Sequence, residues 1–541
     1  MTSRQSLEAV RPTQNIAEPN DWWHGAVIYQ IYPRSFCDAN ADGVGDLPGI
    51  VARLDYVADL GVDAIWISPF FKSPMRDFGY DVADFCDVDP VFGTLADFDA
   101  LVAKAHNLGL KVVIDQVYSH TSDECAWFTE SRRNRTNAKA DWYVWADAKP
   151  DGSPPNNWQS VFGGAAWTWD ESRSQYYLHN FLSAQPDLNV RNPDVQRALL
   201  DVATFWLERG VDGFRLDAAN YYMHDASLRD NPPTALTAPN EPPALKGSAH
   251  NKSQPENLRF IENLRALMNR YPGRFTVAEI GDHDAIAEMA DYTAGNNRLN
   301  TAYSFVFIDS EEVCPNRIRT AIEQWSQASD AWPAWTFSNH DRARVVSRWG
   351  RDKPRQAFAN LMNALLLTLR GIAFVYQGEE LGLPQSAIPF EKLRDPEAIR
   401  NWPQTLGRDG ARTPMPWTTA THGGWPVDPW LPMDPKHVSL AVEAQAQDPK
   451  SCLTTTKSLL RLRHASPTLR YGEISFLTAP PSVLAFERRF GGNRLLCVFN
   501  LADAPMSWPN APAVGNILLA LNDTDRPDRL PALGALIAEV L

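Results

Sequence analysis

Short apolar runs recur along most of the chain, and amphipathic segments separate several of them. The eight runs are residues 26–33, 62–70, 111–120, 211–219, 275–281, 301–309, 331–341 and 371–382. The segments 95–109 and 194–210 show helical spacing of apolar residues and end in glycine, a common helix stop. Strands that alternate with helices favour a parallel sheet, so eight such units predict an α/β fold, a (β/α)8 TIM barrel.

Two interruptions and one change of pattern predict the domain organisation. We expect the barrel to occupy residues 1–120 and 191–467. The segment 121–190 between the third and fourth runs is too long for one helix and is rich in Asn, Trp and Gly. These residues are expected to form a subdomain inserted after the third strand. The polar, proline-containing segment 221–258 is expected to be a long loop over the active site. Residues 468–541 contain two alternating runs around Gly-Gly, which predict a hairpin in a C-terminal antiparallel β domain.

The composition restricts the partners that the protein can have. The 541 residues carry a formal net charge of −14, which disfavours nucleic acid and anionic membrane surfaces as partners. No apolar stretch is long enough to span a membrane, and the N-terminus has no signal-peptide core. The six cysteines form no CxxC pair, so we expect reduced thiols and a cytoplasmic location. Both a monomer and a homodimer remain open.

Acidic residues and histidines stand where four of the expected strands end. They are Asp115 and His120 on the third strand, Arg215 and Asp217 on the fourth, Glu279 on the fifth, and Asn339, His340 and Asp341 on the seventh. Each alone is best explained as a polar group that caps a helix. The carboxyl ends of barrel strands share one rim, however, so together these residues predict one site.

Carboxylates from several strands suggest cleavage of a glycosidic bond, which needs one carboxylate at the anomeric carbon and one acid at the leaving oxygen. Arg215 and Asp217 are two residues apart and therefore share one face of a strand. We expect the Arg215 charge to keep Asp217 ionised as the nucleophile. Glu279 lies among apolar residues, so burial is expected to raise its pKa and keep it protonated as the general acid.

With these residues in place, the chain resembles the α-amylase family of glycoside hydrolases (family 13), in its bacterial α-glucosidase and oligo-1,6-glucosidase branch. The matching stretches are DFGYDVADF (77–85), DQVYSH (115–120), QPDLN (185–189), GFRLDAA (213–219), VAEIG (277–281), FSNHD (337–341), YQGEELG (376–382) and RDGARTPMPW (408–417). The resemblance implies that Asp217 is the nucleophile, Glu279 the acid/base and Asp341 a third carboxylate that helps to distort the sugar.

The resemblance also implies a set of residues that bind the terminal sugar. These are Asp77, Tyr80, His120, Phe162, Phe181, Arg215, His340 and Arg408. Tyr80 would be a stacking platform, and the two phenylalanines would wall the pocket. Asp77 and Arg408 would grip the far side of the sugar and close the pocket to one terminal residue. The same two residues could instead form a purely structural salt bridge, and both roles are compatible.

A separate loop has the composition of a cation site. Asp38, Asn40, Asp42 and Asp46 alternate with small residues in DANADGVGD, an oxygen-rich pattern that suits Ca²⁺ or Mg²⁺. The loop resembles the calcium loop of the branch, in which the carbonyl of Val44 would add a ligand. A turn without any ion is the alternative. We expect a structural ion and no organic cofactor.

These residues together predict a retaining, exo-acting α-glucosidase that acts on small-molecule α-glucosides and transfers glucose to water or to other hydroxyl acceptors. The small residue Ala218 after the nucleophile is associated in this branch with α-1,4 linkages. A sucrose- or trehalose-acting glucosyltransferase or isomerase of the same family is the alternative. A non-catalytic transporter subunit is disfavoured, because such relatives need a membrane anchor and usually lose the carboxylates.

Overall fold

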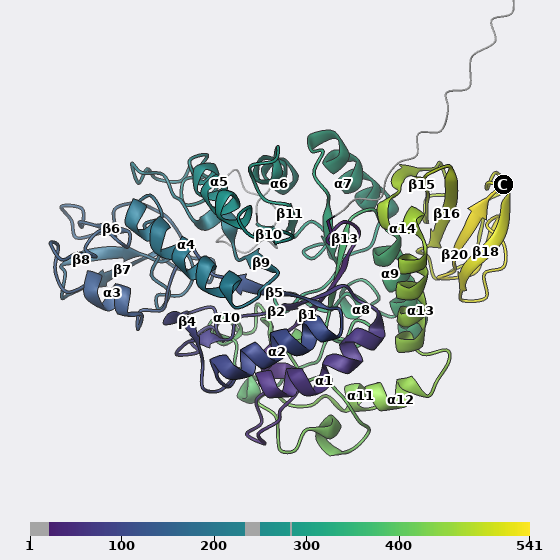
Figure 1. Cartoon of the computed structure of the whole chain (residues 1–541), viewed down its shortest axis with the longest axis horizontal. Coiled ribbons are helices and arrows are strands. Elements are labelled where there is room, and N and C mark those ends of the chain that lie inside the picture. Colours follow the sequence, from purple (N-terminus) through teal and green to yellow (C-terminus); the bar gives the residue numbers. More distant parts are fainter. Residues whose placement is uncertain (1–20, 233–248, 282–283) are drawn as a thin grey trace, which may run out of the picture.

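The computed structural model describes residues 21–232, 249–281 and 284–541. Of the expected long loop 221–258, residues 233–248 therefore lie outside the described part of the chain. In Figure 1 the barrel occupies the middle of the molecule, the inserted segment lies at one end and the C-terminal sheet at the other.

Within the described residues, eight parallel strands form the central sheet. They are β1 (Val27–Ile31), β2 (Ala64–Ile67), β5 (Lys111–Gln116), β9 (Gly213–Leu216), β10 (Phe275–Ile280), β11 (Thr301–Ser304), β12 (Ala334–Thr336) and β13 (Ile372–Tyr376). Each lies inside one of the eight apolar runs. The strands pair in the order β11-β10-β9-β5-β2-β1-β13-β12, and the two edge strands β11 and β12 lie next to each other. The predicted (β/α)8 barrel is confirmed, with a nearly closed sheet.

Helices cover the outside of the sheet, as Figure 1 shows. The longer ones are α1 (Leu47–Leu60), α2 (Leu95–Asn107), α4 (Pro193–Glu208), α5 (Asn257–Met268), α6 (Ala285–Thr293), α7 (Pro315–Ala328), α9 (Arg355–Thr368) and α13 (Cys452–Ala465). Short helices are α3 (Ala126–Ser131), α8 (Val345–Arg348), α10 (Pro396–Asn401), α11 (Pro435–Val438), α12 (Val442–Ala446) and α14 (Pro467–Tyr471). Helix α2 begins in a capping box between Thr94 and Asp97, and α2 and α4 confirm the two predicted helical segments.

The alternation of side chains along the strands separates two buried layers. One set of residues, including Ile28, Trp66 and Phe374, packs inside the barrel, and the larger core lies between the strands and the helices. On β9 the same period of two directs Arg215 away from the helix layer, because its neighbours Phe214 and Leu216 belong to the larger core. An ion pair at the end of this buried strand therefore faces the barrel interior.

The segment after β5 forms a small sheet of β6 (Trp145–Ala146), β7 (Trp167–Asp170) and β8 (Gln175–Leu178) in the order β6-β8-β7. Its own apolar cluster contains Trp158, Trp167 and Leu178. An isolated bridge between His120 and Asp187 connects the segment after β5 to the far end of the insert. A further pair, β3 (Phe71–Lys72) and β4 (Asp84–Val88), lies between β2 and α2 in the sequence.

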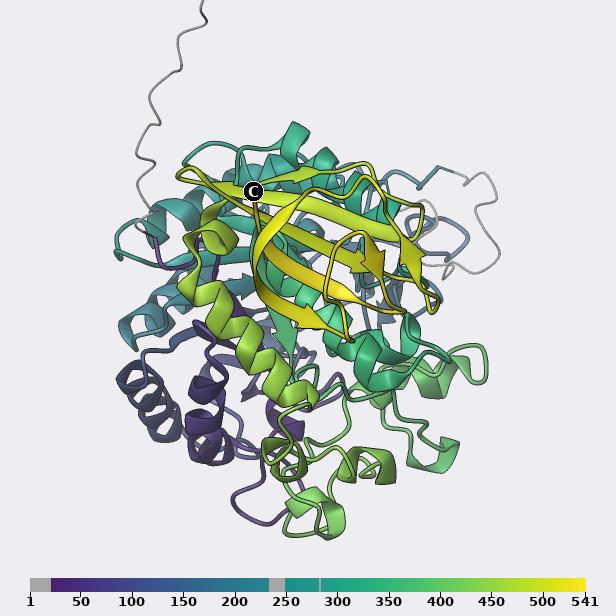
Figure 2. The ribbon, with the colours of Figure 1, turned by 90° about the vertical axis from the view of Figure 1, so that its right-hand side faces the viewer.

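The C-terminal sheet is antiparallel, as predicted, and Figure 2 shows it face-on in yellow. Its strands are β14 (Glu473–Phe476), β15 (Val483–Phe490), β16 (Asn493–Asn500), β18 (Val514–Leu521) and β20 (Ala535–Val540), with β17 (Met506–Ser507) and β19 (Arg529–Leu530) paired beside them. Phe490 pairs with Asn493 across Gly491 and Gly492, which both have positive φ. This geometry confirms the predicted hairpin.

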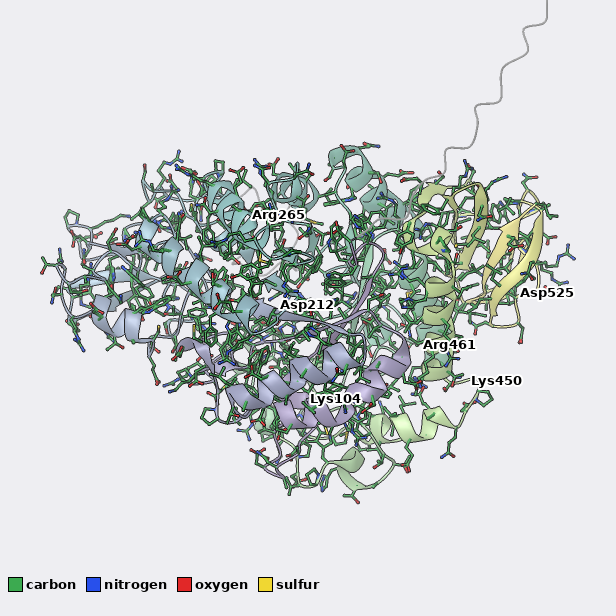
Figure 3. All side chains as sticks on the ribbon, in the orientation of Figure 1. Lys104, Asp212, Arg265, Lys450, Arg461 and Asp525 are labelled. Atoms are coloured by element: carbon green, nitrogen blue, oxygen red, sulfur yellow. The ribbon has the colours of Figure 1, made fainter. Side chains whose placement is uncertain are left out.

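Charged residues at the beginning of the strands have a different arrangement from those at their ends. Asp212, labelled in Figure 3, precedes β9, is almost fully buried and accepts a hydrogen bond from the backbone of Val112. It also pairs with His106, Lys111 and Arg274, which come from neighbouring units of the barrel. This cluster joins neighbouring units of the barrel at the face where residues usually serve stability.

No helix of the described residues is long and apolar enough to cross a membrane.

Candidate active site

Arg215 is the centre of the charged cluster at the carboxyl ends of the strands. Its Nη1 lies 2.6 Å from carboxylate oxygens of both Asp115 and Asp217, and its Nη2 lies 2.6 Å from Glu279. The guanidinium is fully buried, and its Nε donates to the Tyr303 hydroxyl, which in turn donates to Glu279. One guanidinium thus brings the predicted Asp217 and Glu279 to a common site, together with a third carboxylate.

Burial dominates the acidity of these carboxyl groups. It raises the pKa of Glu279 to about 7, against the lowering effect of Arg215. Burial also raises the pKa of Asp217 to about 7 and that of Asp115 to about 6, again against Arg215. The raised pKa of Glu279 agrees with our expectation. The pKa of Asp217 differs from it, because a single guanidinium is shared by three carboxylates and cannot keep each of them fully ionised.

A second network runs from β1 to β5 through the predicted sugar-binding residues. The amide nitrogen of Gln30 lies 2.8 Å from Nδ1 of His340. Because an amide NH2 group donates, Nδ1 of His340 accepts, and the ring proton of His340 is on Nε2. Nε2 lies 2.6 Å from the Tyr80 hydroxyl, which donates to Asp115. Burial lowers the pKa of His340 to about 3, so its ring is neutral at neutral pH. The Tyr80 and His340 rings also stack, with centroids 5.4 Å apart.

Asp341 lies in a different electrostatic environment from the other two predicted catalytic carboxylates. Its Oδ1 is 2.8 Å from Arg412 and 3.5 Å from Arg408, and its Oδ2 is 3.3 Å from His340. Burial opposes ionisation, but His340 and the two arginines together lower the pKa of Asp341. Asp341 is therefore held as a carboxylate, while Glu279 titrates near neutral pH.

Asp77 and Arg408 form a buried ion pair of 2.7 Å, as both predicted roles require. The other oxygen of Asp77 accepts from the amide of Gln185, 3.1 Å away. The Arg408 guanidinium lies over the Phe162 ring at 5.1 Å, and its Nη2, which binds Asp77, also lies 2.8 Å from Asp395.

Phe181 places its ring 5.1 Å from that of His120 and 6.3 Å from that of Phe162. The structure therefore places all the predicted sugar-binding residues in one continuous set of contacts.

His120 is buried and neutral, and its contacts join the barrel to the insert. Burial lowers its pKa to about 4. Its Nε2 lies 3.0 Å from the Tyr80 carbonyl, which can only accept, so Nδ1 accepts from the Ser119 hydroxyl at 2.9 Å. Asp187 of the insert accepts from both the backbone and the side-chain amide of Asn180. Hydrogen-bond donors of Asn180 thus satisfy both carboxylate oxygens of Asp187 at the junction between the barrel and the insert.

The predicted cation loop closes mainly on its own backbone. Asp38 accepts from the backbone of Asn40 and Ala41 with one oxygen and of Gly43 with the other. Asp42 accepts from the backbone of Val44 at 2.8 Å.

Asp46 accepts from Gly49 at 2.6 Å as the N-cap of α1, and its other oxygen accepts from Ala39. Among the described residues, no three His, Cys, Asp or Glu side chains converge as a metal-holding group. The oxygen chemistry of the loop still fits a hard cation, because each carboxylate oxygen has two lone pairs. Both hypotheses for the loop stay open.

Several site residues were not predicted from the sequence. They are Gln30, Trp66, Gln185, Tyr303, Asp395 and Arg412, whereas Asp115 was predicted at this rim as a charged strand end but was given no role. Trp66 and Tyr303 share the inward parity of Arg215 on their strands, a signal that the register of the sheet would have revealed. Asp395 has no such signal, because its segment has no period that points to the barrel.

The arrangement offers two carboxyl groups that titrate near neutral pH, a third that stays ionised, and a buried ion pair beside them. Groups of this kind can protonate a leaving oxygen, attack an acetal carbon and stabilise the charge that develops between them. A site with this chemistry at the carboxyl ends of barrel strands defines a glycoside hydrolase.

The chain belongs to the α-amylase family, because residues 30–472 match the model of the alpha amylase catalytic domain. It is 50% identical to a "Probable alpha-glucosidase" of Rhizobium meliloti (strain 1021) over 545 residues, which cover 98% of this chain and 99% of that protein.

Two solved structures are also similar over nearly the whole chain. The alpha-glucosyl transfer enzyme XgtA is 49% identical, with a TM-score of 0.92 and coverage of 97% of this chain and 100% of that one. The trehalulose synthase MutB from Pseudomonas mesoacidophila MX-45 is 30% identical, with a TM-score of 0.89 and coverage of 97% and 100%. The predicted family is confirmed.

Proposed function

We propose that the protein is a retaining, exo-acting α-glucosidase that removes terminal glucose from short α-glucosides. The observation that carries this proposal is the carboxylate cluster around Arg215 beside the buried Asp77–Arg408 pair. The cluster supplies the chemistry, and the ion pair would close the pocket behind one terminal sugar. The name of the Rhizobium meliloti relative agrees with this activity.

In the proposed mechanism, protonated Glu279 donates its proton to the glycosidic oxygen while the Asp217 carboxylate attacks the anomeric carbon. The C–O bond to the leaving group breaks as the bond to Asp217 forms, which gives a covalent glucosyl-enzyme. The Glu279 carboxylate then takes a proton from water or another hydroxyl, which attacks the same carbon and releases Asp217. Asp341 would bind hydroxyls of the sugar as it distorts.

We further propose that the enzyme prefers α-1,4 linkages and transfers glucose to hydroxyl acceptors. Ala218 directly follows the nucleophile, has a φ of 40° and donates through its backbone to Glu279 at 3.4 Å. A small side chain there leaves room beside the leaving group. Transfer follows from the glucosyl-enzyme itself, since any well-placed hydroxyl can replace water, and the likeness to an alpha-glucosyl transfer enzyme supports it.

The proposal is tested with an aryl α-glucoside and two variants of Asp217. We expect Asp217→Asn to abolish turnover and NMR of the wild-type reaction to show α-glucose as the first product. Asp217→Gly with azide should give β-glucosyl azide, because the small anion enters the space of the lost carboxylate from the same face. Full activity of the Asn variant, or β-glucose as the first product, would rule out the mechanism.

The alternative is a sucrose- or trehalose-acting glucosyltransferase or isomerase, and the likeness to a trehalulose synthase favours keeping it. Such an enzyme would use the same glucosyl-enzyme but retain the leaving sugar as the acceptor. Product analysis after incubation with maltose, isomaltose and sucrose distinguishes the two. Glucose and transfer products from maltose support the α-glucosidase, whereas rearranged disaccharides from sucrose support the alternative.

We also propose that the loop 38–46 holds a structural Ca²⁺ or Mg²⁺ through Asp38, Asn40, Asp42, Val44 and Asp46. Its oxygen donors and the burial of Asp38 and Asp46 support this proposal. When bound, the ion would tie the loop to the start of α1. Elemental analysis of purified protein should give one ion per chain, and chelation should lower the melting temperature. Asp42→Asn, at the exposed side of the loop, should weaken that response.

The cytoplasmic location likewise remains a proposal. It is supported by the six cysteines, which all lie in the described residues and are all free. Cell fractionation tests it directly, and size-exclusion chromatography with light scattering would distinguish a monomer from a homodimer.

A further inference from the structure

The Arg408 guanidinium has a second buried carboxylate partner besides Asp77. Asp395 is fully buried, and its Oδ1 lies 2.8 Å from Nη2 and 3.2 Å from Nε of Arg408. Its Oδ2 accepts from the Arg408 backbone at 2.6 Å. Nη2 of Arg408 also donates to Asp77 at 2.7 Å. The guanidinium is therefore held between two carboxylates.

Asp395 also belongs to the loop that carries Arg408. It is the N-cap of helix α10, where it accepts from the backbone of Glu397. Its own backbone amide donates to Asp409 at 2.9 Å. Although burial would raise it, the charge and hydrogen bonds of Arg408 bring the pKa of Asp395 to about 2. Asp395 is therefore ionised at neutral pH, where it can pair with Arg408.

Without Asp395, the long side chain of Arg408 would have more than one carboxylate with which to pair. Nη1 of Arg408 already lies 3.5 Å from Asp341, the carboxylate expected to bind the reacting sugar. Without Asp395, Arg408 could turn towards Asp341 and leave Asp77 without its partner. Immobilising such a side chain in advance removes an entropic cost from substrate binding.

We propose that Asp395 is a positioning residue that aims Arg408 at Asp77 and so preforms the part of the pocket that binds the far side of the terminal sugar. The inference rests on the proposed function, and it assigns Asp395 no contact with the substrate. The geometry behind it is that Asp395 binds both Nε and Nη2 of Arg408, which a purely structural N-cap would not need.

The test compares an aryl α-glucoside with its 4-deoxy analogue, which lacks the hydroxyl opposite the anomeric carbon. In the wild type, we expect loss of this hydroxyl to lower kcat/KM roughly tenfold or more, the effect of a hydrogen bond to a charged group. In Asp395→Asn we expect KM for the complete glucoside to rise more than kcat falls. The penalty for the deoxy analogue should shrink towards one, because Arg408 is no longer aimed.

Two further variants make the result specific. Asp409→Asn removes another buried carboxylate of the same segment, which within the described residues accepts from the backbone of Arg394 and Asp395, so it should keep the wild-type penalty. Asp395→Ser keeps an N-cap for α10 but cannot grip the guanidinium, and it should behave as Asp395→Asn does.

An unchanged deoxy penalty in folded Asp395→Asn or Asp395→Ser would overturn the inference and leave Asp395 a structural residue. A wild type that does not cleave α-glucosides would instead overturn the proposed function.

Discussion

Replacing Glu279 by glutamine should make the protein more stable at alkaline pH while removing its general acid. Glu279 is almost fully buried, and burial raises its pKa from 4.5 to about 7. At about 1.4 kcal/mol per pKa unit, this rise corresponds to about 3 kcal/mol of free energy of unfolding. Glutamine occupies the same space without a charge, and its oxygen can still accept from Tyr303.

The sign follows from where the proton is bound. Below pH 4.5 the carboxyl is protonated in both states, and its folded form carries no ionisation cost. Between pH 4.5 and about 7 the unfolded chain ionises while folded Glu279 keeps its proton, so the wild type loses stability as the pH rises. Glu279→Gln lacks this loss. We therefore expect it to exceed the wild type by up to about 3 kcal/mol at pH 8 and to match it near pH 4.5.

The assay is thermal unfolding of both proteins from pH 4.5 to 8 at one fixed scan rate, since a chain of this size can unfold irreversibly. The difference in melting temperature should grow with pH. Glu539→Gln, an exposed carboxylate of the C-terminal sheet, is the control and should give no such trend. A Glu279→Gln variant that is less stable than the wild type at pH 8, or equally shifted at every pH, would refute a carboxyl group of raised pKa.

Three other predictions follow from single features. Because Glu279 and Asp217 both have pKa values of about 7, kcat/KM should peak near pH 7 and fall on both sides, with the alkaline limb lost in Glu279→Gln. Gly213→Ala should lower the melting temperature by the equivalent of about 1–3 kcal/mol, because its Cβ would lie 2.6 Å from the carbonyl of Phe275. Arg463 donates to four backbone carbonyls, so Arg463→Met should destabilise the chain, and Arg463→Lys should not restore it.

The barrel could be predicted from the sequence because its signals are local. Each strand is a short buried run, and helical periods separate several of them, so eight runs are enough to suggest closure. Asp217 and Glu279 could be located for the same reason, since both stand at the ends of such runs. The hairpin of β15 and β16 was marked by Gly491 and Gly492, which supply the two positive φ angles that its turn needs.

Contacts that depend on the closed structure could not be predicted in this way. The contact of Asp395 with Arg408 joins two positions on either side of the short helix α10, and the contact of Gln185 with Asp77 spans 108 residues. Neither segment has a period that reveals which side chains meet. The sharing of Arg215 by three carboxylates was missed because it depends on the register between β5, β9 and β10. For that reason the sequence predicts an ionised Asp217, whereas burial raises the pKa of Asp217 to about 7.

The distribution of arginines influences which carboxyl groups in this buried site hold a proton. Arg408 and Arg412 both lie against Asp341, whose pKa is lowered in spite of its burial. Among the described residues, Arg215 alone forms ion pairs with the other cluster, where three carboxylates share it and burial raises the pKa of Glu279 to about 7. Buried ion pairs are a costly way to stabilise a fold, because desolvation offsets most of their attraction. An unequal distribution of arginines is instead what acid/base chemistry needs, since it keeps one carboxylate charged and lets another carry a proton in the same buried site.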